Sequence, residues 1–278
     1  MTFHPQLNQV FMMVVINNTT NPPTFDMAKL LASRRAMYGL PIATALLVFV
    51  GWELIVRIFG IAEFILPTPS SILAEIPQWG GAVLKNAWTT LFTTVVGFLI
   101  ALVLGVLIGF IIGYSKLASL TLYPLLIGFN TIPKVALVPL MSIWFGIGAI
   151  PAVLTAFLLA VFPIAVNVAS GLATVESEMQ DVLLALGANR FEIFQKVGLP
   201  HTMPYLFASL KVAISQAFIG SVIAETVASN GGIGYVILSA SSNFNVPLAF
   251  LALLSLAVMG VALYSIFVVL EKRFVHWI

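Results

Sequence analysis

The chain has 278 residues, of which 60% are hydrophobic and only 8% are charged. Soluble domains carry roughly 25% charged residues, so this composition excludes an ordinary soluble domain and predicts an all-α polytopic membrane protein. A net charge of +2 on so few charged residues gives no basis for nucleic-acid binding. The chain has no cysteine, which excludes disulfides and thiolate chemistry, and three scattered histidines predict no metal site.

The N-terminal residues 1–36 are predicted to form a cytoplasmic tail, and residues 37–278 a transmembrane domain. The tail contains one apolar run, at 11–16, which is far shorter than the ~20 residues a span needs, and no cleavable signal peptide is expected. Six spans are predicted, and a long polar loop at 172–204 connects the fourth span to the fifth. We place the spans at about 39–60, 86–113, 118–145, 151–171, 205–227 and 247–269.

Local patterns refine several of these segments. Glu53 and Arg57 are four residues apart in the first span, a spacing that favours mutual neutralisation. Thr68 followed by Pro69 predicts the start of a short surface helix. Small residues recur every fourth position along one face of the second span, which predicts close helix packing within the subunit or between subunits. These small residues are Gly97, Ala101, Gly105, Gly109 and Gly113.

The third span is predicted to be broken. It contains three prolines, Pro124, Pro133 and Pro139, which exclude one straight helix. Asn130, Thr131 and Lys134 cluster around the second proline. Broken helices are tolerated at membrane depth where they are buried or line a water-filled cavity. This segment is therefore the leading candidate for the substrate path.

Several side chains are candidates for the path or its gate. Lys134 either supplies a positive field for an anion or is neutralised by snorkelling or by pairing with Glu225 or Glu53. Glu225, together with Ser221 on the fifth span, acts either as a gating and structural partner or as a direct contact. Trp144 is interpreted as an outer gate or as part of an interfacial aromatic belt. Asn86 and Asn167 are interpreted as ordinary helix-bonding residues.

Lysine and arginine placement predicts the orientation. With six spans, nine of the twelve basic residues fall on the side that holds both termini and the 172–204 loop. These nine are Lys29, Arg34, Arg35, Lys116, Arg190, Lys196, Lys211, Lys272 and Arg273. Both termini and the loop are therefore expected in the cytoplasm.

The polar segment 176–200 is expected to form two short helices. Gly187 is the predicted stop of the first helix, and Asn189 with Glu192 fits a capping box that opens the second, at 190–197. Leu199 and Pro200 are expected to end the second helix. The first helix is apolar on one face, which it must bury either on its own spans or in a groove of a partner.

The same segment carries a family signature. DVLLALG at 181–187, nine further residues and Val197-Gly198-Leu199-Pro200 resemble the loop of ABC-transporter permeases of the type I importer class. That signature is Glu-Ala-Ala, three residues, glycine, nine residues and Ile-x-Leu-Pro. Val182 and Leu183 replace its two alanines, which requires a roomier partner groove. Segments 66–73, 131–148 and 209–225 resemble the nitrate/taurine/alkanesulfonate branch.

The resemblance implies a type I ABC importer permease fold in the bacterial cytoplasmic membrane. It implies a dimer of permeases, with a homodimer as the simpler default, two cytoplasmic ABC ATPase subunits and an extracytoplasmic substrate-binding protein. ATP and magnesium would bind the ATPase subunits, and this chain would have no cofactor or catalytic residue of its own. The implied coupling residues are Glu178, Asp181, Val182, Leu183, Gly187, Ala188, Arg190, Leu199 and Pro200.

The function predicted is therefore ATP-driven import of a small solute, with an anion such as nitrate or a sulfonate favoured. The chain has no GxxxxGK[ST] motif, so it has no nucleotide site of its own. A self-sufficient secondary transporter or channel is the alternative, but it leaves the polar loop unexplained. A membrane enzyme would need a cluster of catalytic side chains, and the sequence shows none.

Overall fold

The computed structural model describes residues 34–275, so most of the predicted 1–36 tail lies outside the described residues. The chain divides into two compact units, one up to residue 55 and one from residue 56 onward. The first unit contains most of α3 (Arg34–Ile58), an apolar helix that begins close to the predicted first span. The helices that follow α3 all lie in the second unit.

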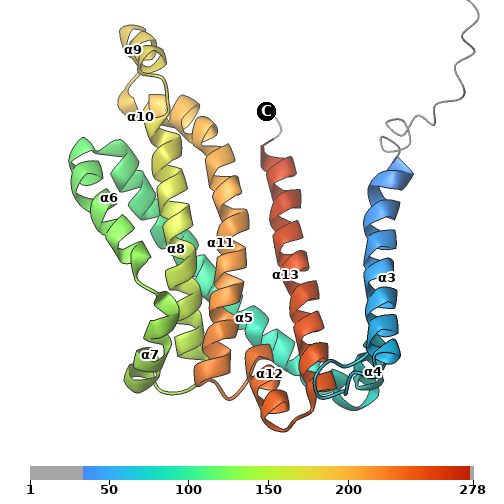
Figure 1. Ribbon diagram of the computed structural model, residues 1–278. Coiled ribbons are helices and arrows are strands. Elements are labelled where there is room, and N and C mark those ends of the chain that lie inside the picture. Colours follow the sequence, from blue (N-terminus) through green and yellow to red (C-terminus); the bar gives the residue numbers. More distant parts are fainter. Residues whose placement is uncertain (1–33, 276–278) are drawn as a thin grey trace, which may run out of the picture. The chain divides into compact units, whose positions relative to one another are not determined.

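The second unit is built from helices, and the described residues contain no strand (Figure 1). Its elements are α4 (Pro69–Ala74), α5 (Ile76–Tyr114), α6 (Lys116–Thr131), η1 (Lys134–Leu137), α7 (Val138–Phe145), α8 (Ala149–Ala173), α9 (Ser177–Ala185), α10 (Arg190–Ile193), η2 (Phe194–Gly198), α11 (Leu199–Ala228), α12 (Ile233–Ser242) and α13 (Val246–Phe274).

Five helical segments in the described chain are long and apolar enough to cross a membrane, or six when a bent pair counts as one span. The bent pair is Lys116–Thr131 with Lys134–Phe145, and its two halves meet at 77°. This confirms the predicted break in the third span. The helix that contains the predicted second span is longer than that span, because α5 begins at Ile76 rather than near 86. Its 39 residues extend about 58 Å, well beyond the apolar stretch from which the span was predicted.

The core of the second unit lies where α5, α8 and α11 pack together. Small side chains such as Ala156, Ala160 and Ala213 fill it alongside larger ones such as Phe98 and Ile164. In Figure 1, α9 and α10 lie at one end of α8 and α11, whereas α7 and α12 lie at the other. Sequence analysis did not predict α12, whose ten residues are too few to form a span.

The small-residue face of α5 packs within the subunit, against α8. A Cβ atom built on Gly109 would lie 2.6 Å from the carbonyl oxygen of Ala165 and 2.7 Å from Cβ of Val168. Comparable close approaches occur along the same face at Gly97, Gly105 and Gly113. The backbones of α5 and α8 therefore approach as closely as only glycine permits.

Gly109→Ala is expected to lower the thermal unfolding midpoint, because the added methyl group forces α5 away from a backbone carbonyl. Overpacking of this kind costs about 1–3 kcal/mol. Gly81→Ala is the matched control on the same helix, since a Cβ there meets nothing within 4 Å. Tryptophan fluorescence of the detergent-solubilised protein measures both midpoints. Equal midpoints for the two variants would contradict the packing argument.

Candidate functional site

The break between α6 and η1 places polar groups between the two halves of the broken third span. The 16 residues of α6 rise about 24 Å before the break, and the helices η1 and α7 follow it, so the break lies between the ends of this span rather than at one of them. Proline at 133 has no N–H, and the carbonyls that precede it need other donors. Thr131 donates its hydroxyl to the carbonyl of Gly128 at 2.7 Å, and Lys134 donates to the carbonyl of Asn130 at 3.0 Å.

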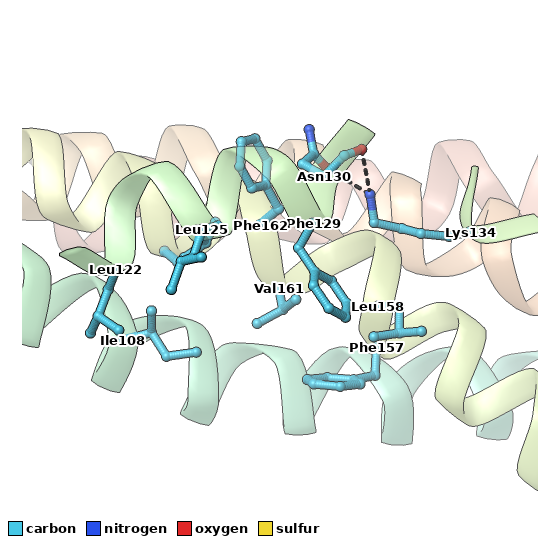
Figure 2. A pocket seen from close by; sticks show the side chains of 12 residues that line it. Ile108, Leu122, Leu125, Phe129, Asn130, Lys134, Phe157, Leu158, Val161 and Phe162 are labelled. Atoms are coloured by element: carbon cyan, nitrogen blue, oxygen red, sulfur yellow. Dashed lines mark hydrogen bonds between the residues drawn. The ribbon is translucent and has the colours of Figure 1, made fainter. Parts of the chain in front are cut away.

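Lys134 is the charged group of this break, and only 9% of its surface is exposed. Its Nζ donates to the side-chain oxygen of Asn130 at 2.7 Å as well as to the backbone carbonyl of that residue (Figure 2). The alternative pairing with Glu225 is not among the described contacts, because the Glu225 carboxyl group bonds Thr90 and Lys134 bonds Asn130. The lysine is thus held by neutral acceptors within its own turn.

A cavity of about 360 Å³ lies beside Lys134, between α5, α6 and α8. Asn130 and Lys134 are its polar residues, and their side chains meet at one side of it (Figure 2). The remaining lining residues are Ile108, Leu122, Leu125, Leu126, Phe129, Phe157, Leu158, Val161, Phe162 and Ala165. Sequence analysis did not find this cavity, because its apolar walls look like any other membrane-spanning residues.

A second polar cluster surrounds Glu225 on α11, whose side chain is 1% exposed. Thr90 donates its hydroxyl to one carboxyl oxygen at 2.8 Å, and the backbone N–H of Gly234 donates to the same oxygen at 3.2 Å. The hydroxyls of Thr93 and Ser221 lie 3.2 and 3.4 Å from the other oxygen. Glu225 therefore joins α5, α11 and the start of α12 through a fully buried network.

The turn that precedes α12 is fastened by the same cluster. Asn86 bonds its own helix as predicted, because its amide nitrogen donates to the carbonyl of Ala82 at 2.8 Å, and its side-chain oxygen also accepts the N–H of Gly232 at 2.8 Å. Thr90 accepts the N–H of Ile233 at 2.8 Å while it donates to Glu225. Gly232 has a φ of +94°, and a Cβ there would collide with the Glu225 carboxyl group. Asn167 likewise bonds its own helix, at 2.8 Å to the carbonyl of Pro163.

One sequence signal for this cluster was available. Thr90 and Thr93 continue, toward the start of α5, the face that carries Gly97 and Ala101. Polar residues that extend a close-packed small face have to find partners on the neighbouring helix. The predicted path residues thus fall into two groups, Asn130 with Lys134 and Ser221 with Glu225. Thr131 bonds only its own turn, and Trp144 on α7 lies exposed with its ring edge-on to Phe145.

The polar loop forms the two predicted helices, joined by a tight Gly187 turn. Gly187 has a φ of +86°, and its N–H bonds the carbonyl of Leu184 at 3.0 Å. The N–H of Ala188 bonds the carbonyl of Leu183 at 3.0 Å, which completes a Schellman motif. The capping box follows at once, because Asn189 and Glu192 exchange backbone-to-side-chain bonds of 2.8 and 2.9 Å. Both caps agree with the sequence prediction.

The end of the second helix was predicted wrongly. Leu199 and Pro200 do not stop it; they begin α11, which follows α10 through the π-helical segment η2. In this segment the N–H of Leu199 bonds the carbonyl of Phe194, five residues earlier. The wider turn shifts the hydrogen-bond register just before Pro200, whose missing N–H is tolerated in the first turn of a helix. The second helix of the loop, α10, is consequently continuous with α11 through η2.

The loop exposes apolar side chains instead of burying them on its own spans. Val182 is 59% exposed, Leu186 77% and Phe191 70%. Glu178 and Asp181 on α9 are exposed as well, whereas the side chain of Arg190 lies outside the described residues. At the base of the loop, Phe194 packs edge-on against Phe110 of α5, with ring centroids 5.2 Å apart. The loop is therefore anchored at its base and apolar at its tip.

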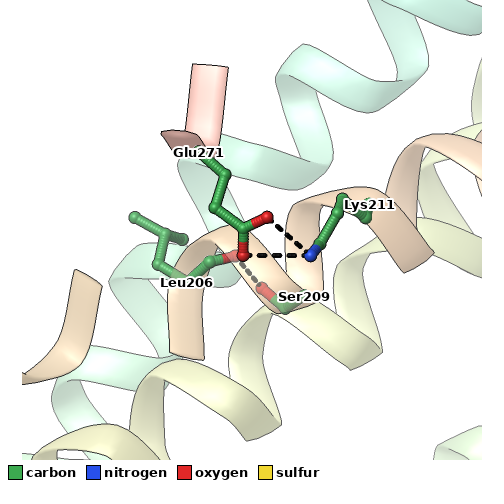
Figure 3. A network of polar contacts seen from close by, with 4 residues as sticks. All are labelled: Leu206, Ser209, Lys211 and Glu271. Carbon is green, nitrogen blue, oxygen red and sulfur yellow. Dashed lines mark hydrogen bonds and ion pairs between the residues drawn. The ribbon is translucent and has the colours of Figure 1, made fainter. Parts of the chain in front are cut away.

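An ion pair fastens α13 to α11. Lys211 Nζ lies 2.9 and 2.7 Å from the two carboxyl oxygens of Glu271, and both side chains are partly exposed (Figure 3). On the preceding turn, Ser209 donates to the carbonyl of Leu206 at 2.7 Å. The pair joins residues 60 positions apart, which no local pattern could have predicted.

Comparison with known proteins identifies the family. Residues 101–276, more than half of the chain, match the family described as "Binding-protein-dependent transport system inner membrane component". This chain belongs to that family. The permease RibX of a riboflavin transport system in Chloroflexus aurantiacus is 35% identical over 241 residues, which cover 86% of this chain and 90% of that protein. The chain is thus a permease subunit of an ABC importer and a multi-pass inner-membrane protein.

Other relatives of the permease are named after different transported compounds. The putative aliphatic sulfonates permease SsuC of Bacillus subtilis is 28% identical, with 81% of this chain and 83% of that protein covered. The formylaminopyrimidine permease ThiX of Halalkalibacterium halodurans is 27% identical, with 84% and 93% covered. An inward-facing structure of the MetNI methionine ABC transporter shares the fold at a TM-score of 0.61 and 20% identity, covering 69% of this chain and 95% of that chain.

Membership also settles what the permease does not do. Permease subunits of this family have no ATPase activity and carry no cofactor, because ATP binds to a separate ATPase subunit. A binding-protein-dependent system also includes a substrate-binding protein. The permease therefore contributes a path for the solute and a contact for the ATPase, and its polar clusters have to be understood in those terms.

Proposed function

We propose that, in a pair of permeases, the helices α9 and α10 form the surfaces that contact two cytoplasmic ATPase subunits. We also propose that the solute passes the break in the third span at Lys134. The observation that carries the proposal is the loop itself, a doubly capped helix pair with exposed apolar side chains at its tip. A protein rarely exposes such side chains on a short polar helix unless a partner covers them. Val182 and Leu183 would require a wider groove than the alanines of the family signature.

The capped loop is suited to transmit motion. It continues into α11 through η2, and the edge-on contact of Phe194 with Phe110 joins its base to α5. His201 at the start of α11 lies 3.2 Å from the hydroxyl of Thr174 at the end of α8, which closes the base. A displacement of the loop by an ATPase subunit would therefore move the ends of α8 and α11 together, as alternating access requires.

The remaining assembly follows from the predicted topology. Both termini and the loop would lie in the cytoplasm, and a second copy of the chain would complete the permease pair. The substrate-binding protein would dock at the opposite end, where α7 and α12 lie (Figure 1). Lys134, a buried cation with neutral partners, supports a small anion as the cargo, with nitrate and sulfonates as the first candidates.

Leu186→Asp and Phe191→Asp are each expected to weaken binding of the partner ATPase by more than about tenfold, because buried apolar anchors dominate such interfaces. Phe244→Asp is the control. Phe244 is also highly exposed but lies between α12 and α13, and its φ of +57° suits aspartate. Titration of the purified permease with the ATPase measures the affinity. Unchanged affinity for both loop variants would overturn the proposed contact.

A further inference from the structure

We propose that the cavity beside Lys134 holds the transported solute and selects an anion with a flat apolar body over a small inorganic anion such as nitrate. This rests on the proposed function, because it takes the break in the third span as part of the path. It narrows the two candidate classes of that function, because it keeps the sulfonates and excludes nitrate.

The walls of the cavity argue against a bare inorganic anion. All lining residues other than Asn130 and Lys134 are apolar, so no other side chain in the lining offers a donor. An anion stripped of water needs a donor for each exposed oxygen, and apolar walls supply none. A larger anion places only its head beside the polar pair and its body against the walls, which apolar contact then stabilises.

The size and shape of the cavity point to a ring system. Its volume of about 360 Å³ is near the lower end of small-molecule sites, which range over about 300–1,000 Å³. At about 30 Å³ for each water molecule, it equals about a dozen waters, far more than a four-atom anion fills. Phe129, Phe157 and Phe162 contribute rings to the walls (Figure 2). Aromatic side chains favour offset or edge-on contact with a flat ring.

The charge of the cavity selects the head group. Lys134 has three N–H donors, and the two described bonds both go to Asn130, so one donor is left for a ligand. No carboxylate is among its described contacts, and the charge is buried with only neutral acceptors. A carboxylate or sulfonate at this place would supply both the missing acceptor and the missing counter-charge.

A membrane lipid presents the same chemistry, an apolar body with an anionic head, but the backbone argues for a transported solute. The chain is non-helical at Ile132 and Pro133, between α6 and η1. Interrupted backbone does not face lipid, and occurs at membrane depth only where it is buried in protein or lines a water-filled cavity. The cavity adjoins this interruption, and Ile132 and Pro133 are exposed on the single chain. The second copy of the proposed permease pair or an aqueous path therefore has to cover this side of the cavity.

The test is equilibrium binding of radiolabelled naphthalene-2-sulfonate to the purified permease with its ATPase, without ATP. We expect saturable binding that excess unlabelled naphthalene-2-carboxylate displaces and equimolar nitrate or palmitate does not. Lys134→Met and Phe157→Ala should each weaken it by about tenfold or more, the scale of a lost charged hydrogen bond or a lost ring contact. Lys116→Met and Phe92→Ala are the controls, because neither residue lines the cavity.

Three results would overturn the inference: no saturable binding to the wild-type complex, displacement by nitrate as effective as by the naphthalene carboxylate, or preferential displacement by palmitate, which would identify a lipid site. These measurements use wild-type protein, so they remain decisive if Lys134→Met fails to fold. Because no ATP is involved, they are independent of the contact between the loop and the ATPase. Loss of ATPase binding in the loop variants tests the proposed function separately.

Discussion

Replacing Gly187 with valine is expected to abolish ATP-driven uptake while the permease remains inserted and folded. Gly187 has a φ of +86°, which a β-branched residue adopts only with a strain of about 1–3 kcal/mol. A Cβ at this position meets nothing within 4 Å, so the effect arises from the backbone alone. Relief of the strain would open the Schellman turn and change the angle at which α9 meets α10.

Gly187→Asn is the matched control, because asparagine tolerates this backbone conformation and would keep the turn. Uptake and ATPase activity are measured together in proteoliposomes that contain the partner ATPase and the substrate-binding protein. We expect the valine variant to lower uptake by more than about tenfold and to hydrolyse ATP without dependence on solute. The asparagine variant is expected to retain most of the uptake and most of the solute-dependent ATP hydrolysis. Equal transport by the two variants would show that the loop does not need a rigid turn.

The helix pair could be predicted from sequence because its determinants are local. A glycine at C′ and an Asn–Glu pair three residues apart fix their own backbone, and the structure has each of the hydrogen bonds that they imply. The break in the third span was predictable for the same reason, since Pro133 removes a donor from its own helix. The prediction that Leu199 and Pro200 end the helix was wrong, because proline breaks the interior of a helix but is tolerated in its first turn.

The interior of the permease could not be predicted, because its contacts join distant residues. The hydroxyl of Thr90 reaches Glu225 across 135 positions in the sequence, and neither residue has a local pattern that identifies the other. Glu225 was correctly singled out as a charge that a membrane-spanning helix has to satisfy. Its partners were not found, since hydroxyls and backbone N–H groups at that distance leave no periodic signal. The residues that line the cavity beside Lys134 are mostly apolar, as lipid-facing residues are, so the sequence alone does not distinguish the two groups.

The network around Glu225 matters most for the turn between α11 and α12. The carboxyl group accepts from Thr90 and from the N–H of Gly234, and Thr90 in turn accepts the N–H of Ile233. No other described element fixes the backbone of this turn as densely. If the outer end of the path opens and closes, α12 and the turn have to move or hold as one piece, and the buried carboxyl group is what joins them to α5.

Glu225→Leu is therefore expected to lower the unfolding free energy by about 2–5 kcal/mol, because the buried N–H of Gly234 loses its acceptor and the hydroxyls of Thr90 and Thr93 lose one of theirs. Glu225→Gln keeps the shape and one oxygen, but its amide nitrogen faces other donors, so an intermediate loss is expected. Glu63→Leu, at an exposed carboxylate, is the control. Tryptophan-monitored unfolding gives the stability, and hydrogen–deuterium exchange of residues 229–236 shows whether the turn is released. A leucine variant with wild-type stability and unchanged exchange would mean that the carboxyl group does not hold this turn.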